Sequence, residues 1–86
     1  MNPFLAPIER ELDRTGTCDL VCHFDYKGQR QEVKERVVRM PDGSLRLYAI
    51  NDQGEVAGEH RGDPSLWLEY FSQWGYAVRP QEFAPA

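Results

Sequence analysis

The chain has 86 residues, of which 41% are hydrophobic and 28% charged, and its net charge is −4. This size suits one domain with a small core, and the apolar content is that of a folded chain rather than a disordered one. The short length disfavours a deep catalytic cleft, and the negative charge disfavours nucleic acid and anionic membranes as partners. No apolar run approaches the roughly 20 residues that cross a bilayer. We expect one domain over residues 1–80 and a tail over 81–86.

The N-terminal sequence and the two cysteines indicate the cellular compartment in which we expect the protein. Residues 1–11 lack the basic and long apolar regions of a secretory signal. Cys18 and Cys22 are four residues apart in a predicted strand, so their Cα atoms lie about 13 Å apart, beyond the reach of a disulfide. Free thiols suit a reducing compartment, and we expect a cytoplasmic protein.

The first predicted element is a helix. Leu5, Ile8 and Leu12 recur at spacings of three and four residues, and Gly16 is suited to end the helix. Pro7 must lie in the first turn, since deeper in a helix it removes a hydrogen bond and clashes. The helix therefore begins near Ala6, or begins at Pro3 and is bent.

Residues 17–26 alternate between apolar and polar side chains, which predicts a half-buried antiparallel strand. Lys27 and Gly28 then form a two-residue hairpin turn. The resulting register places opposite charges face to face on the outward side and apolar residues on the inner side: Asp25 with Arg30, His23 with Glu32, Asp19 with Arg36, Cys22 with Val33, and Cys18 with Val37. The weak point of this register is Glu35, which faces inward opposite Leu20.

Two further turns extend the sheet. Pro41, Asp42 and Gly43 suit a three-residue hairpin loop, after which Val37 meets Leu47 inside and Arg36 meets Tyr48 outside. The sequence "NDQG" forms a third turn, and residues 55–60 are a weak candidate for an edge strand.

The last predicted element is an aromatic helix that Asp63 caps, Pro64 begins and Gly75 ends. Its apolar residues cover about 140° of the helix, widened to about 200° by Leu68. We expect its four aromatic rings to be core: Trp67, Tyr70, Phe71 and Trp74. The flank at Leu68 must pack on the first helix, on the tail, or on a partner. The fold class is thus α+β, an antiparallel meander of three to four strands with the N- and C-terminal helices on one face.

No catalytic motif is present, and we expect neither enzymatic activity nor a cofactor. Cys22 and His23 are adjacent in a strand, so their side chains point to opposite faces and cannot act as a nucleophile and its base. His23 lies among carboxylates and, together with His60, raises the idea of a metal site, but the spacing is not specific to any metal. A paired surface histidine is the better interpretation of His23.

The outward sheet face is the more informative surface. The register gathers apolar and basic side chains there, a mixture that is typical of the centre of a protein interface. With the helix flank, the predicted partner contacts are Val21, Lys34, Arg36, Val38, Arg46, Tyr48, Ile50 and Leu68. The alternative is a solvated sheet carrying scattered apolar residues.

We therefore expect a small non-enzymatic protein-binding module, such as a regulator or inhibitor of a larger complex, with a homodimer as a further possibility. One form of this idea is an inhibitor of nucleic-acid-handling machinery, in which Asp52, Glu55 and Glu59 occupy a site meant for phosphates. The alternatives are a self-assembling structural subunit and a nucleic-acid-binding domain that uses the basic residues around Tyr48, namely Lys34, Arg36, Arg39 and Arg46.

The order helix, three antiparallel strands, helix is similar to that of the double-stranded RNA-binding domain. That family grips phosphates with lysines at the start of its second helix. Here the helix starts with "DPSLWLE", which carries Asp63 and Glu69, and no Lys or Arg follows before Arg79. The resemblance is therefore limited to the order of elements, and nucleic acid is not the expected partner.

Overall fold

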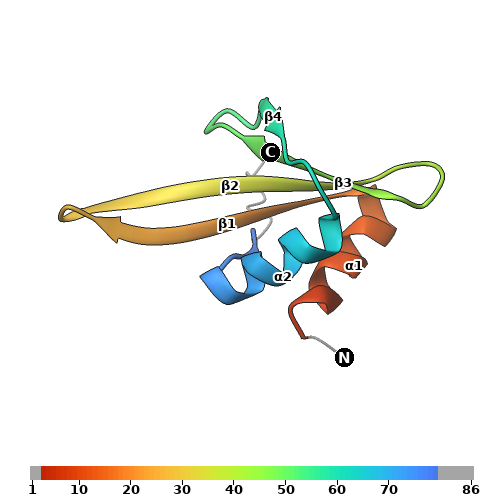
Figure 1. Ribbon diagram of the computed structural model, residues 1–86, viewed down its shortest axis with the longest axis horizontal. Helices are drawn as coiled ribbons and strands as arrows, with labels where there is room; N and C mark the ends of the chain where they lie inside the picture. The colour runs from red at the N-terminus through yellow and green to blue at the C-terminus, as the bar shows by residue number, and fades with distance from the viewer. Residues whose placement is uncertain (1–2, 80–86) are drawn as a thin grey trace, which may run out of the picture.

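The computed structural model describes residues 3–79 and has an α+β fold. Its elements are α1 (Leu5–Thr15), β1 (Thr17–Tyr26), β2 (Gln29–Arg39), β3 (Leu45–Ile50), β4 (Val56–Glu59), α2 (Pro64–Trp74) and β5 (Ala77–Val78). The strands form one antiparallel sheet in the order β4-β3-β2-β1-β5, and both helices cover the same face of it (Figure 1). The meander with two helices on one face is confirmed. The predicted tail over residues 81–86 lies outside the described residues.

The predicted strand register is also confirmed. Lys27 and Gly28 have φ angles of 51° and 77°, as a two-residue turn with two left-handed positions requires. All five predicted β1–β2 pairs are formed, and Val37 lies opposite Leu47. Charge pairing on one face and apolar pairing on the other act together here, because a slip of one residue would exchange the two faces.

Local signals define the helix ends as well. The side chain of Asp63 accepts a hydrogen bond from the Ser65 backbone N–H, Pro64 begins α2, and Gly75 ends it at a φ of 87°. Helix α1 begins at Leu5, which places Pro7 in the first turn. Within residues 3–79, neither helix has the length and apolar composition needed to cross a membrane.

Strand β5 was not predicted. After α2 the chain returns to the sheet for two residues, and Val78 and Ala77 pair with Leu20 and Val21 of β1. A two-residue strand has no alternating pattern to detect, because alternation becomes visible only over about four residues or more. The sheet therefore has a fifth strand beyond the three or four expected.

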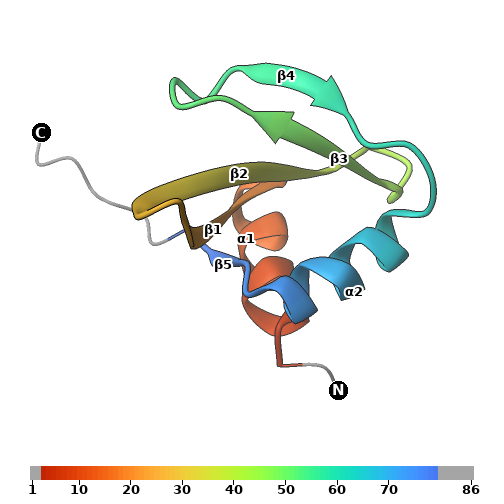
Figure 2. The ribbon, with the colours of Figure 1, turned by 60° about the vertical axis from the view of Figure 1, so that its left-hand side comes forward.

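Both helices lie on one side of the sheet, as Figure 2 shows in a second view, and the core side chains come from the helices and from the sheet. Helix α1 contributes Ile8 and Leu12, and α2 contributes Leu68 and Phe71. The sheet supplies the facing layer: Cys18, Leu20, Val37 and Leu47.

The first hairpin is longer than the helices that cover it. Strand β1 has 10 residues and α2 has 11. At about 3.3 Å per strand residue and 1.5 Å per helical residue, these lengths are about 33 Å and 17 Å. The far end of the β1–β2 hairpin therefore extends past the helical layer (Figure 1).

Candidate functional site

The structure places every predicted contact residue except Leu68 on the outward face of the sheet, opposite the helices. Much of this face is shielded from solvent, however. Val21, Lys34 and Ile50 are each only 7% exposed, and Arg36, Val38 and Tyr48 are half-buried. Of the predicted contacts on the sheet, Arg46 alone is exposed, with half of its side chain in contact with solvent.

The basic side chains of this face are paired within the chain. The Arg36 guanidinium donates hydrogen bonds to both carboxylate oxygens of Asp19, at 2.7 and 3.1 Å, and to the Gly54 carbonyl at 3.1 Å. The bond to Asp19 raises the pKa of Arg36. Arg46 Nη1 lies 3.0 Å from Glu59 Oε2. These charges are largely neutralised before any partner arrives.

Lys34 belongs to a second group of paired charges. Its Nζ lies 2.9 Å from Glu32 Oε1 and 3.5 Å from Asp52 Oδ1. Glu32 Oε2 also lies 2.7 Å from Nε2 of His23. The hydrogen bonds from Lys34 and His23 lower the pKa of Glu32. His23 is therefore a paired surface histidine, as predicted.

The second histidine lies on the opposite face of the sheet. His60 Nε2 is 2.6 Å from Glu35 Oε2, and the hydroxyl of Tyr76 donates to Glu35 Oε1 at 3.3 Å. This explains how Glu35, only 4% exposed, is tolerated on the inner face. Burial, and next the charge of Glu35, raise the pKa of Tyr76. His23 and His60 are not brought together, and no three potential metal ligands cluster among residues 3–79.

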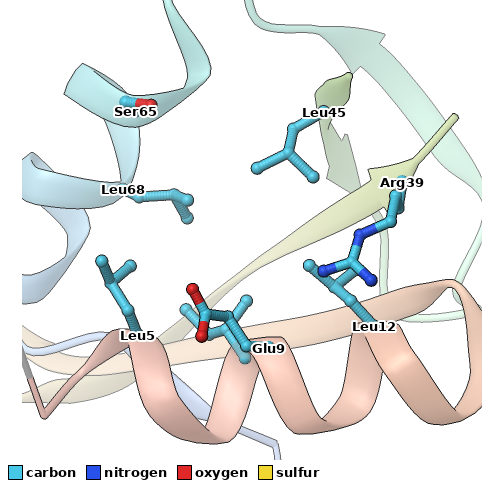
Figure 3. Close-up of a pocket in the computed structure, with 8 residues that line it drawn as sticks. Leu5, Glu9, Leu12, Arg39, Leu45, Ser65 and Leu68 are labelled. Atoms are coloured by element: carbon cyan, nitrogen blue, oxygen red, sulfur yellow. The ribbon is translucent and has the colours of Figure 1, made fainter. Parts of the chain in front are cut away.

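Leu68 lies in the core rather than on an accessible edge. It is 5% exposed and faces a hollow of about 190 Å³ between α1 and α2, shown in Figure 3. The other residues lining this hollow are Leu5, Ile8, Glu9, Leu12, Arg39, Leu45 and Ser65. Of the three places predicted for Leu68, it occupies the one beside the first helix, in the same core cluster as Ile8 and Leu12. Because it is buried there, Leu68 is not an accessible partner contact, and that prediction is corrected.

The exposed apolar side chains of α2 lie on the side of the helix away from Leu68. Leu66, Tyr70 and Trp74 are 52%, 47% and 57% exposed, whereas Phe71 is 1% exposed. The prediction that Tyr70 and Trp74 belong to the core is therefore wrong. Their spacing of four residues puts them on one stripe, and their rings stack with centroids 5.7 Å apart and planes 12° apart.

The end of the first hairpin continues this exposed surface. On the side facing the helices, Phe24 is 44%, Tyr26 56% and Val33 37% exposed. The Cys22 thiol donates a hydrogen bond to the Trp74 carbonyl at 3.3 Å, so the last turn of α2 meets β1 where the uncovered part begins. Phe24 is the next residue on the same face, about 7 Å further along. We call these six side chains the aromatic surface: Phe24, Tyr26, Val33, Leu66, Tyr70 and Trp74.

The alternating pattern of residues 17–26 predicts the face of each side chain but not whether a helix covers it, so the hairpin end is absent from the predicted contacts. A signal was nevertheless available, since a strand of ten residues is about twice as long as a helix of eleven. A helix of this length cannot cover both Cys18 and Tyr26, which lie at opposite ends of β1.

Comparisons of the chain with models of protein families, with curated proteins and with solved structures give no match. A function can therefore be argued only from the surfaces of the chain itself.

Proposed function

We propose that the chain is a small non-enzymatic protein-binding module that holds its partner on the aromatic surface. The observation that carries this proposal is the exposure of Leu66, Tyr70 and Trp74 on a helix that buries Phe71 on its other side. Three large apolar side chains on one stripe lose contact with water only when another molecule covers them. Tyr and Trp are also enriched among the residues that dominate binding energy at protein interfaces.

The two α2 rings of the aromatic surface, Tyr70 and Trp74, are held in place before binding. Tyr70 contacts the rings of both Trp67 and Trp74, with centroids 6.2 and 5.7 Å away, and Trp74 also contacts Phe71. Side chains that are already ordered lose little conformational entropy on association. The outward sheet face has fewer free groups to offer, because Lys34, Arg36 and Arg46 already have carboxylate partners.

The environment of Cys18 argues against a role for this thiol as a nucleophile. Burial raises the pKa of Cys18 to about 12, so the thiol stays protonated and is a poor nucleophile at neutral pH. Cys18 and Cys22 are both free and buried, which supports a cytoplasmic location. A regulator or inhibitor of a larger assembly is the role we assign to an acidic module of this size with one apolar contact surface.

Affinity capture from the native lysate tests the proposal, with nuclease present and each variant checked for folding by circular dichroism. The test variant is Tyr70→Ala/Trp74→Ala, and the matched control is Glu69→Ala/Gln73→Ala on the same helix. We expect one stoichiometric protein to be recovered with wild type and control and lost with the test variant.

Other outcomes would contradict the assignment. Loss of the partner with Tyr48→Ala but not with Tyr70→Ala/Trp74→Ala would move the contact to the outward sheet face. Recovery only when nuclease is omitted would favour the nucleic-acid alternative. A solution mass of two or more chains for the purified protein alone would favour self-assembly.

A further inference from the structure

The hairpin end that carries part of the aromatic surface also carries an open strand edge. Strand β5 pairs with β1 only at Leu20 and Val21, whereas β1 continues to Tyr26. Within residues 3–79, no strand pairs with this side of β1 beyond Val21. In Figure 2, β5 is the short segment beside β1.

The hydrogen bonds of β1 determine which backbone groups point to the open edge. The carbonyl of Asp19 accepts a bond from the Arg79 N–H on the β5 side at 2.9 Å, whereas that of Gly16 accepts from Arg39 on the β2 side. Because backbone groups alternate between the two edges of an antiparallel strand, odd-numbered residues of β1 face the β5 side. His23 and Asp25 therefore direct their N–H and C=O groups to the open edge.

The even-numbered residues that follow them, Phe24 and Tyr26, offer side chains suited to a partner strand. Phe24 and Tyr26 project from the same edge toward the helix side, where Trp74 lies beside Cys22. On the outward side, His23 is bonded to Glu32, whereas Asp25 lies opposite Arg30 but forms no ion pair with it or with another side chain in the described part of the chain. An added strand would thus meet aromatic rings on one face and a free carboxylate on the other.

We propose that the partner contributes an extended segment that adds to the sheet as a strand beside β1, with backbone hydrogen bonds to His23 and Asp25. This rests on the proposed function and names the class of partner. Alternate apolar side chains of the segment pack on Phe24, Tyr26 and Trp74, and a Lys or Arg faces Asp25.

The second edge of the same hairpin is less suitable. Pairing with β3 ends at Lys34, so Arg30 and Glu32 have no partner strand within residues 3–79 either. Their neighbours on the helix side are Gln29, Gln31 and Val33, of which two are polar and none is aromatic. The β1 edge is favoured because its side chains are aromatic.

The experiment uses the full chain and a synthetic peptide of about seven residues in which Lys alternates with Val or Phe. The test variant is Asp25→Pro, which removes one N–H at the open edge but no β1–β2 bond, and proline is tolerated at an edge in this orientation. The matched control is Asp25→Ala, which loses the charge but keeps the N–H. A second control is the peptide with alternate amides N-methylated, which keeps its side chains but cannot form the ladder.

We expect calorimetry to show binding that Asp25→Pro weakens about tenfold and Asp25→Ala by about threefold, and that N-methylation abolishes. Amide exchange of His23 and Asp25 should be fast in the free chain and slow in the complex. Any of three results would overturn the proposal: the peptide does not bind at millimolar concentration, it binds Asp25→Pro and Asp25→Ala equally well, or it protects the amides of Arg30 and Glu32 instead. So would concentration-dependent protection without peptide, which would identify a second copy as the occupant.

Failure of this inference can be told apart from failure of the proposed function. If the captured partner is lost with Tyr70→Ala/Trp74→Ala but kept with Asp25→Pro, the aromatic surface binds the partner and strand addition is wrong. If neither variant affects capture, the proposed function itself is wrong.

Discussion

The outward sheet face and the aromatic surface both carry large apolar side chains, but only the sheet face combines them with basic residues, and the fold buries the two sets to different extents. On the sheet face, Arg36 and Lys34 are bonded to carboxylates, and Val21 and Ile50 are each 7% exposed. On the aromatic surface, no side chain is less than 37% exposed. A mixture of apolar and charged residues is therefore not enough to indicate an interface, because the charges can be satisfied within the chain. What distinguishes a contact surface is apolar area that the rest of the fold leaves uncovered.

The largest expected effect that separates the two surfaces is on stability. Ile50→Ala removes a buried side chain from the sheet face, and we expect the free energy of unfolding to fall by about 2–3 kcal/mol. The matched change on the aromatic surface, Trp74→Ala, should lower it by less than about 1 kcal/mol, because that ring is already more than half in water. Urea unfolding of both variants measures the difference. An equal fall in the free energy of unfolding for both variants would contradict the conclusion that the sheet face is buried and the aromatic surface is not.

The next effect tests the charge network of the sheet face. Arg36→Met keeps most of the side-chain volume but leaves Asp19 and the Gly54 carbonyl without their donor, and we expect a loss of about 1 kcal/mol. The control is Arg46→Met, since the Arg46–Glu59 pair is exposed and contributes little. Thermal unfolding at low and high salt compares the two. No difference between them would show that the Arg36 contacts do not hold the β3–β4 turn on the sheet.

The smallest effect is the response of the sheet face to acid. Hydrogen bonds from Lys34 and His23 lower the pKa of Glu32 in the folded chain. The stability that this carboxylate contributes is therefore fully present above the unfolded pKa of about 4.3, and it is lost as the pH falls through the lower folded value. We expect unfolding experiments from pH 5 downward to show a smaller decline for Glu32→Gln than for wild type. Parallel curves of stability against pH for wild type and Glu32→Gln would contradict this. The solvent exposure of the aromatic surface should not change with pH in this range.

The parts of the fold that the sequence predicted are those determined by neighbouring residues or by one hairpin. The β1–β2 register follows from a two-residue turn at Lys27 and Gly28 and from charges that meet across it. The limits of α2 follow from Asp63, Pro64 and Gly75, each of which acts within one helical turn.

The candidate site was predicted less well because it depends on distant contacts. A helical stripe about 200° wide can be covered from either flank, and the sequence of α2 does not say which. Helix α1 covers the flank at Leu68, which leaves Tyr70 and Trp74 exposed. Glu35 likewise finds His60 and Tyr76 at separations of 25 and 41 residues, which no local pattern reveals.

By itself, the sequence determined the elements other than β5, their order, the register of the β1–β2 and β2–β3 pairs and the face on which each of their residues lies, because periodicity, turns and caps act over a few residues. Only the tertiary structure decided which apolar side chains are covered. That depends on where two helices of about 17 Å rest against a hairpin of about 33 Å. The same inner-face pattern therefore yields a buried Cys18 at one end of β1 and an exposed Tyr26 at the other.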